Sequence, residues 1–214
     1  EFDPGYPLQF EEYSYGLSIQ EKARNLIGPT ATYSIFIPTS SAPADAWKGD
    51  AGLDEFDDAA WRSGSGGIGT LSFESEDLLL DLKDDLLGKA TSLYARIPFE
   101  TSDDFFLLER LSLDLNYGDG FIAYLNGERV VASRFPDDPA WNSRARGSNS
   151  DSRAVVFENF DISESIGLLR PGRNVLAIHG MNSSDGSSDF LILPEVTAAA
   201  IDDSGLVLNR PTVI

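Results

Sequence analysis

Residues 133–153 hold the side chains of this sequence that are best suited to binding a ligand. Four of the 16 basic residues of the chain fall in this stretch, and two aromatic residues lie among them. The six residues are Arg134, Phe135, Trp141, Arg144, Arg146 and Arg153. An indole face stacks on the apolar face of a pyranose ring, and a guanidinium group binds carboxylate or sulfate through two hydrogen bonds. The stretch therefore predicts recognition of an acidic polysaccharide.

The same stretch also has a purely structural interpretation. Trp141 would close one edge of the fold, and the arginines would pair with Asp137, Asp138 and Asp151 of their own stretch. A connection of this length without secondary structure is usually either functional or disordered. Both interpretations stay open at the level of sequence.

Residues 182–189 form a second candidate site, for a metal ion. Asn182, Asp185 and Asp189 present amide and carboxylate oxygens at short spacing, which are the ligands that calcium prefers. The stretch is not an EF-hand loop, because the glutamate that closes such a loop is missing. We expect one structural calcium as the only cofactor; in the alternative, Asp189 caps backbone amides at the start of a strand.

Two further aromatic residues are candidates for a binding surface. Tyr124 and Ile122 face away from Phe121, Ala123 and Leu125 in the expected strand, so Tyr124 lies either in a binding groove or in the core. Trp47 lies in a stretch rich in Pro, Ala, Asp and Gly, and it would reach the rim of such a groove.

Catalytic chemistry has little support in this sequence. There is no cysteine, no Gly-x-Ser-x-Gly motif and no phosphate-binding loop, and the single histidine is His179. His179 shares a strand face with Val175 and Ala177, which favours a hydrogen-bonded core histidine over a catalytic base. No two of the 35 acidic residues are marked as the carboxylate pair of a glycoside hydrolase. The chain is therefore expected not to be an enzyme.

The charge of the chain restricts its partners. The net charge is −19, so the surface repels the phosphates of nucleic acid. The apolar runs are too short to cross a bilayer, so membrane insertion is not expected either.

The candidate residues depend on strands that a central segment organises. Leu111, Leu113 and Leu115 alternate with polar residues, which is typical of a strand with one buried face. Residues 117–120 then turn the chain. Residues 121–125 are apolar on both faces, and Asn126-Gly127 supplies the positive φ angles of a tight hairpin turn. Three consecutive antiparallel strands are expected here.

Further strands are expected from alternating or apolar runs elsewhere in the chain. They cover residues 33–38, 71–74, 92–99, 154–157, 174–181 and 189–194, and residues 13–19 are a candidate edge strand. One helix is expected over residues 75–88, because Leu78, Leu79, Leu82 and Leu86 fall on one helical face. The absence of strand–helix alternation excludes a parallel α/β fold. The pattern predicts an all-β antiparallel sandwich with one short helix and long loops.

Four fragments in this order resemble a known family. They cover residues 56–61, 92–99, 119–127 and 169–178. Together they resemble the galactose-binding-domain-like jelly roll, as found in the sugar-binding domain of family 2 glycoside hydrolases and in non-catalytic modules of large secreted bacterial proteins. The resemblance covers roughly residues 30–200, and it raises the expectation of a structural calcium. It also implies that Trp61 packs under a sheet and that Arg96 pairs with an acid on a neighbouring strand.

These observations predict one module and its neighbours. We expect a linker or the tail of a preceding module in residues 1–29, the sandwich in residues 30–200 and an extension in residues 201–214. The chain is expected to be an excised, non-catalytic carbohydrate-binding module of a secreted or cell-surface bacterial protein, with neighbouring domains of the parent chain as further partners. The alternative is a structural or protein-interaction spacer without a glycan ligand, because this fold serves both roles.

Overall fold

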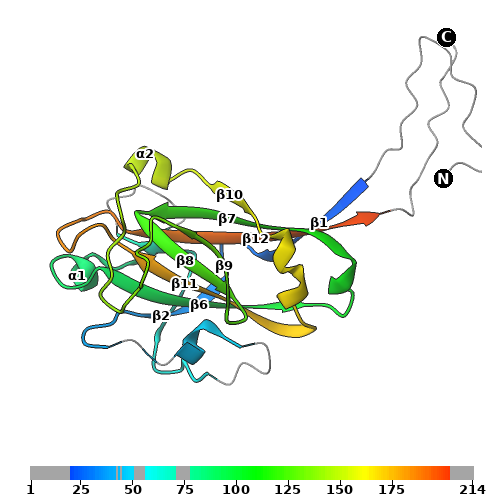
Figure 1. Cartoon of the computed structure of the whole chain (residues 1–214), viewed down its shortest axis with the longest axis horizontal. Coiled ribbons are helices and arrows are strands. Elements are labelled where there is room, and N and C mark those ends of the chain that lie inside the picture. The colour runs from blue at the N-terminus through cyan, green and yellow to red at the C-terminus, as the bar shows by residue number, and fades with distance from the viewer. Residues whose placement is uncertain (1–19, 42, 44, 51–55, 71–77, 203–214) are drawn as a thin grey trace, which may run out of the picture.

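The structure, a computed structural model, describes residues 20–41, 43, 45–50, 56–70 and 78–202. Two six-stranded sheets face each other with a hydrophobic core between them. In Figure 1 the sheet of β7, β10 and β12 lies above the sheet of β2, β6 and β11. The prediction of an all-β sandwich is confirmed.

The first sheet has the strand order β10-β7-β12-β4-β5, and β1 pairs with β12 beyond this path. Its pairings are antiparallel except for β4 with β5, which run parallel. The strands are β1 (Gln20–Ile27), β4 (Gly67–Gly69), β5 (Leu78–Asp81), β7 (Leu108–Gly118), β10 (Glu158–Asp161) and β12 (Leu191–Asp202).

The second sheet has the strand order β3-β2-β6-β11-β8-β9 and is antiparallel throughout. The strands are β2 (Thr32–Phe36), β3 (Arg62–Ser65), β6 (Ser92–Thr101), β8 (Gly120–Leu125), β9 (Glu128–Ser133) and β11 (Gly172–Met181).

Helical structure in the described residues is confined to short turns between strands. These are η1 (Asp45–Lys48), α1 (Lys83–Leu86), η2 (Phe105–Leu107), α2 (Asp151–Ala154) and η3 (Ser163–Leu168). No helix in the described part of the chain has the length and apolarity that a membrane crossing requires.

The core follows the alternation of the strands. Leu113 and Leu115 of β7 are fully buried and meet Ile97 and Leu176 of the opposite sheet in one cluster. Successive side chains of a strand point to opposite faces, so a period of two in the sequence becomes one buried face. β8 is buried on both faces, as its apolar run predicts, and Asn126 and Gly127 have the expected positive φ angles of 48° and 94°.

A second apolar layer covers the outer face of the second sheet. The Trp47 ring lies on Tyr94 and Tyr124, with centroid distances of 4.5 and 5.8 Å. Trp61 also packs against this face, stacked on Phe36 at 5.4 Å. Because this layer is made by the connection between β2 and β3, the face of β8 and β11 that points away from the core is buried as well.

Arg96 fastens this layer to the sheet. Its guanidinium is buried, and Nε donates a hydrogen bond of 2.8 Å to Oδ2 of Asp58. A second nitrogen donates to the backbone carbonyl of Trp47, and the Phe56 ring lies 4.8 Å from the guanidinium carbon. The expected acid partner is therefore present, but it comes from the connection before β3 and not from a neighbouring strand.

The expected helix over residues 75–88 is wrong. Leu78–Asp81 forms strand β5 beside β4, and only Lys83–Leu86 is helical. Leu82 and Leu86 are buried as expected. A run of leucines fits the two-residue period of a strand as well as the 3.6-residue period of a helix. Here the strand forms because it pairs with the free edge of β4. Residues 71–77, which include the expected strand 71–74, lie outside the described residues.

The central segment does not form three consecutive strands of one sheet. β7 belongs to the first sheet and pairs with β10 and β12, whereas β8 belongs to the second sheet and pairs with β11 and β9. The turn at residues 117–120 carries the chain from one sheet to the other. Asp119 adopts a φ of 78° there.

The strand expected at residues 154–157 is also wrong. Ala154 ends helix α2 and is buried, but Val155, Val156 and Phe157 are 46%, 62% and 40% exposed. The strand follows at Glu158–Asp161, where it pairs with the edge of β7. The apolar run Val155–Phe157 is typical of a strand, but its side chains are exposed at the surface.

The described part of the N-terminal stretch contributes to the sandwich. Gln20–Ile27 forms β1 and pairs with the C-terminal half of β12, and in Figure 1 the two extend together toward the chain ends. The candidate strand 13–19 lies outside the described residues.

The Arg96 contact gives a prediction about stability. Asp58→Ala leaves the buried guanidinium without this carboxylate, so we expect the free energy of unfolding to fall by about 3 kcal/mol. Asp58→Asn keeps an acceptor oxygen and is expected to cost less. Urea unfolding of both variants measures the difference; an Asp58→Ala variant as stable as the wild type would show that Asp58 does not hold Arg96.

Candidate functional site

The β9–α2 loop (residues 134–150) is fastened to one end of the second sheet. The hydroxyl of Ser92 donates to the carbonyl of Ser143 at 3.0 Å, and that of Thr91 donates to the carbonyl of Asn142 at 3.2 Å. The amide of Ala145 donates to the carbonyl of Asn182 at 3.0 Å. The middle of the loop is thus held over the start of β6 and the end of β11.

The crossing at Gly118-Asp119-Gly120 brings this loop together with the β11–β12 loop. The buried carboxylate of Asp119 accepts hydrogen bonds from the amides of Asn149 at 2.9 Å and Ser183 at 2.7 Å. A Cβ on Gly120 would lie 2.8 Å from the carbonyl oxygen of Arg134, and one on Gly118 would lie 3.0 Å from the carbonyl oxygen of Asp189. Side chains at either glycine would therefore push the loops away.

Between these two loops and α1 lies a pocket of about 220 Å³, called the Trp141 pocket below. Its lining residues are Pro38, Thr39, Lys89, Ala90, Thr91, Trp141, Asn142, Arg144 and Asp185. Trp141 and Arg144, two of the residues predicted to bind carbohydrate, meet here, together with Asp185 of the predicted calcium site. No sequence pattern points to Lys89 or Thr91, which lie in the connection between α1 and β6 and reach the pocket through the fold.

The two basic side chains of the Trp141 pocket, Arg144 and Lys89, are accessible to a ligand. Arg144 lies 3.4 Å from the Asp185 carboxylate, and both side chains are about half exposed. The Lys89 ammonium donates to the backbone carbonyl of Asp84 at 2.6 Å, so no carboxylate among the described residues neutralises it. An indole beside hydroxyl, amide, guanidinium and ammonium donors is an arrangement suited to a sugar ring with an acidic substituent.

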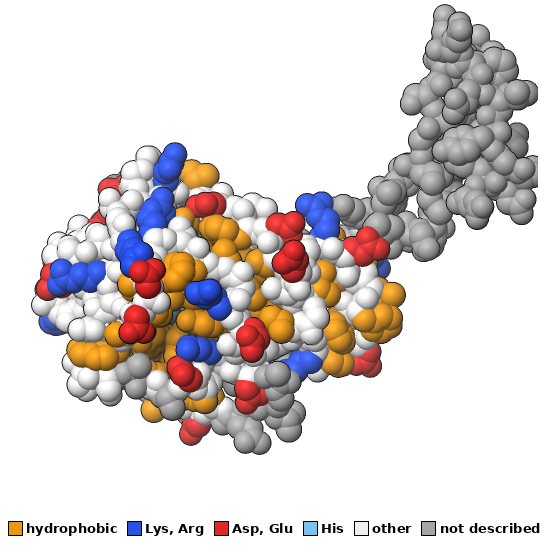
Figure 2. Space-filling model, viewed as in Figure 1, with side chains coloured by type: hydrophobic (Ala, Val, Ile, Leu, Met, Phe, Trp, Pro, Cys, Tyr) orange, Lys and Arg blue, Asp and Glu red, His pale blue; other side chains and the backbone are white. Residues whose placement is uncertain are grey.

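The other loop arginines are placed elsewhere. Arg146 pairs with Asp137, as the structural interpretation predicted, and Arg134 donates to the Tyr117 hydroxyl at 2.9 Å. Phe135 turns toward the apolar outer layer of the second sheet, with the Arg129 guanidinium 5.4 Å from its ring. Figure 2 shows basic side chains in a row on the face where α2 and the loop below it lie.

Tyr124 lies apart from the Trp141 pocket. It is only 8% exposed, because Trp47 covers its ring and the Lys48 ammonium lies 5.1 Å above it. Trp47 itself is 2% exposed, so it lies in the outer layer and not at a rim.

His179 occupies a position suited to structure. It is buried beside Tyr94, and its Nε2 hydrogen bonds to the Ser92 hydroxyl at 2.9 Å. Burial, with a smaller contribution from the charge of Lys48, lowers the pKa of His179 to about 3. The imidazole is therefore neutral at physiological pH and closed off from any substrate.

The three residues of the predicted calcium site are not arranged as a ligand set. The side-chain oxygen of Asn182 accepts from the amide of Ser183 at 3.0 Å, Ser187 donates to Asp189, and Asp185 faces Arg144. Burial and the nearby charge of Asp119 raise the pKa of Asp189. No group of three acidic or histidine side chains among the described residues is placed to hold a metal. The calcium site therefore stays a prediction from the sequence.

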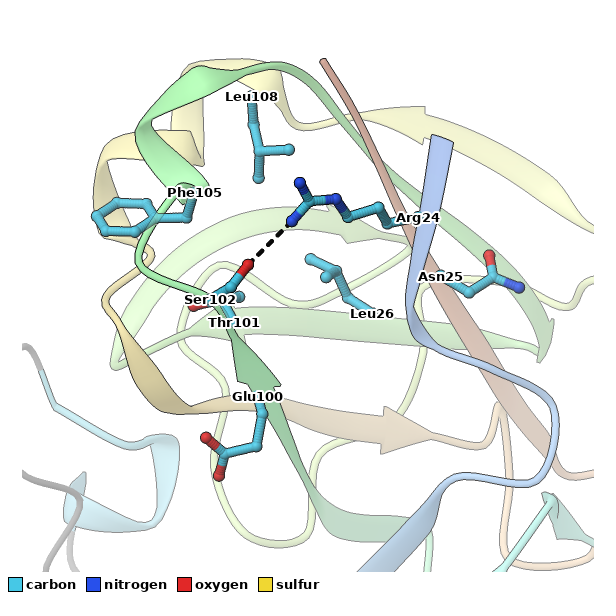
Figure 3. Close-up of a pocket in the computed structure, with 8 residues that line it drawn as sticks. All are labelled: Arg24, Asn25, Leu26, Glu100, Thr101, Ser102, Phe105 and Leu108. Atoms are coloured by element: carbon cyan, nitrogen blue, oxygen red, sulfur yellow. Dashed lines mark hydrogen bonds between the residues drawn. The ribbon is translucent and has the colours of Figure 1, made fainter. Parts of the chain in front are cut away.

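A pocket of about 450 Å³ lies at the opposite end of the sandwich, between β1, the end of β6 and η2. Figure 3 shows that Arg24 reaches across it toward Ser102, whereas Glu100 and Asn25 point away from its centre. Arg24 also donates to both carboxylate oxygens of Asp104. Because Glu100 and Asn25 point away from its centre and Arg24 is paired with Asp104, this pocket is a weaker candidate for a ligand site than the Trp141 pocket.

Comparisons with known proteins give a likeness to parts of larger enzymes. No family model matches the sequence, and no curated protein matches it. Among solved structures, the chain is similar to Bacteroides uniformis β-glucuronidase 2, with 16% identity and a TM-score of 0.49. This match covers 85% of this chain and 18% of that chain.

Two other similar structures are a β-glucuronidase and a glycosyl hydrolase. A β-glucuronidase from an uncultured Clostridium species has 12% identity and a TM-score of 0.46, over 93% of this chain and 31% of that one. A glycosyl hydrolase family 2 member from Bacteroides cellulosilyticus has 10% identity and a TM-score of 0.49, over 83% and 20%. The chain spans less than a third of each, and at these values no activity or residue role is transferred.

The Asp119 carboxylate gives a prediction about the site. Asp119→Gly keeps the positive φ angle without strain but removes both acceptors, so we expect a loss of roughly 2–4 kcal/mol in the free energy of unfolding. Asp119→Asn keeps one acceptor oxygen and is expected to lose less. Hydrogen exchange of the Asn149 and Ser183 amides reports the loosening directly; unchanged protection in Asp119→Gly would contradict this role.

The buried histidine gives a prediction about pH. The pKa of His179 is about 3 when folded and near 6.5 when unfolded, so below pH 6.5 only the unfolded chain takes up this proton. The contribution of His179 to stability should therefore fall as the pH drops below 6.5, by up to ~1.4 kcal/mol per pH unit, and should be constant above it. The variant His179→Gln should lose this slope between pH 6.5 and 5; identical pH profiles of stability would contradict a neutral, buried imidazole.

Proposed function

We propose that this chain is a non-catalytic carbohydrate-binding module of the galactose-binding-domain-like class, and that it binds an acidic polysaccharide at the Trp141 pocket. The observation that carries the proposal is the convergence of an indole, a guanidinium and an ammonium group in one pocket of a chain with a net charge of −19. Neither Arg144 nor Lys89 is needed to hold the fold, because one is half exposed and the other donates to a backbone carbonyl.

The chemistry of the pocket favours a sugar over other ligands. Carbohydrates combine apolar ring faces with many hydroxyl groups, so their sites pair an aromatic face with planar polar groups. The carbonyl-anchored loop fixes these groups before binding, which reduces the ordering cost. A carboxylate or sulfate on the sugar would compete with Asp185 for Arg144, because an exposed ion pair of this kind contributes little by itself.

A protein-interaction spacer is the second candidate function. Phe106 and Leu107 of η2 are 69% and 56% exposed at the end of the sandwich away from the Trp141 pocket. Large exposed apolar side chains that lie together mark protein contacts more often than single ones do. In both cases the chain would work beside other domains of a secreted or cell-surface bacterial protein.

The proposal predicts that the pocket can be disabled without unfolding the chain. Trp141→Ala and Arg144→Gln are each expected to weaken binding to polygalacturonate or heparin about tenfold, which corresponds to ~1.4 kcal/mol. Affinity electrophoresis in gels containing the polymer measures the loss, and thermal melting checks the fold. Binding should also weaken with added salt, since the charges involved are exposed.

Two control variants match these changes. Arg62→Gln removes an arginine that is half exposed and paired with Asp85 at 2.9 Å, as Arg144 is with Asp185, but that lies on β3. Phe106→Ala removes an exposed aromatic ring outside the pocket. Both should bind as the wild type does. Equal binding by all four variants, or no binding of any polysaccharide by the wild type, would reject the proposal in favour of the spacer.

A further inference from the structure

A second pocket of about 420 Å³ lies beside α2, next to the edge of the first sheet. Its walls include Arg134, Asn149, Arg153, Val156, Phe157 and Glu158. Arg134 enters from the start of the β9–α2 loop, and the other residues follow one another from the end of that loop to the start of β10. We call it the Arg153 pocket.

Neither arginine of this pocket forms an ion pair with any of the described residues. The Arg134 guanidinium donates to the Tyr117 hydroxyl at 2.9 Å and lies 5.6 Å from the ring, so its partner is a neutral phenol. The Arg153 side chain has no ion pair or hydrogen bond to any of the described residues. Glu158 is the one acid in the wall, and it already accepts the Tyr117 hydroxyl at 2.7 Å.

The Arg153 pocket also has apolar lining residues that are open to solvent. Val156 is 62% exposed and Phe157 is 40% exposed, although both belong to a short hydrophobic run. Exposed apolar side chains in one pocket with guanidinium groups that form no ion pair match a ligand with an anionic group on an apolar ring face. The lining contains two arginines and one acid, Glu158, whose carboxylate accepts a hydrogen bond from Tyr117. The pocket is therefore locally positive on a strongly acidic protein.

We infer that the Arg153 pocket is a second binding subsite, which takes the carboxylate or sulfate of an acidic sugar residue on Arg134 and Arg153 and its ring on Val156 and Phe157. The inference rests on the proposed function and extends it, because it names the anionic substituent as the group that is recognised. The β9–α2 loop joins the two pockets, and the row of basic side chains in Figure 2 runs along this part of the surface. An acidic chain would therefore contact the module at more than one residue.

Small molecules test the Arg153 pocket without requiring that the chain bind a polymer. Sodium glucuronate, sodium acetate and methyl glucoside are titrated at constant ionic strength while the arginine Nε–Hε resonances are followed by NMR. Glucuronate should shift the Arg134 and Arg153 resonances in a saturable manner. It should bind at least about fivefold more tightly than acetate, which has the carboxylate but no ring. Methyl glucoside, which has the ring but no charge, should bind more weakly than glucuronate.

Variants then link the subsite to the polymer. Arg153→Gln should abolish the saturable shift of Arg134 and weaken binding of polygalacturonate about fivefold to tenfold, since a charge-assisted contact is lost. Arg173→Gln, which makes the same charge change at an exposed position at the start of β11, should leave both unchanged.

The outcomes separate this inference from the proposed function. Shifts that are equal for all arginines, or equal affinities for acetate and glucuronate, would overturn the subsite. So would polymer binding that Trp141→Ala weakens and Arg153→Gln does not. A saturable glucuronate shift at Arg134 and Arg153 without any polymer binding would keep the subsite and reject the polysaccharide function.

Discussion

The crossing at Gly118-Asp119-Gly120 is the constraint on which the rest of this structure depends. It carries the chain from β7 in one sheet to β8 in the other, and the two glycines leave room for the segments that pass it. The buried Asp119 carboxylate then holds the amides of Asn149 and Ser183, one from each loop at this end of the sandwich. A buried carboxylate without such donors is strongly unfavourable, so the loops and the crossing stabilise one another. Asn149 lines the Arg153 pocket, and the β11–β12 loop contributes Asp185 to the Trp141 pocket.

The buried and the exposed cations of the chain have different surroundings. The buried cation Arg96 is satisfied by Asp58 and a backbone carbonyl, and it holds the outer layer on the second sheet. The cations of the two pockets face solvent, paired loosely as in Arg144 or directed at neutral groups as in Lys89. Exposed pairs contribute little to folding. These side chains can therefore exchange their present partners at low cost.

The sequence was sufficient for features that local periodicity determines. The alternation of Leu111, Leu113 and Leu115 and the turn at Asn126-Gly127 predicted a sandwich strand and a hairpin, and both are present. The sequence was not sufficient for the leucine run that forms β5, because this run fits the period of a helix and that of a strand equally well. Only the free edge of β4, with which β5 pairs, favours the strand. The Gly-Asp-Gly motif predicts only a turn. Its contacts with the two loops are not visible in the sequence, because those loops are distant along the chain. For the same reason the sequence pattern places the loop arginines in one site, whereas the fold places Arg144 in one pocket and Arg134 and Arg153 in another, and pairs Arg146 with Asp137.

The measurement that tests the account most directly is the NMR spectrum of the tryptophan indole groups during titration with an oligomer of galacturonic acid. Trp141 lines the candidate pocket, whereas Trp47 is buried in the outer layer and Trp61 packs on Phe36. The account predicts a saturable shift of the Trp141 indole resonance, with little change at the other two and with a loss of the effect in Arg144→Gln. A Trp141 resonance that does not respond to any acidic oligosaccharide, while the fold is intact, would contradict it.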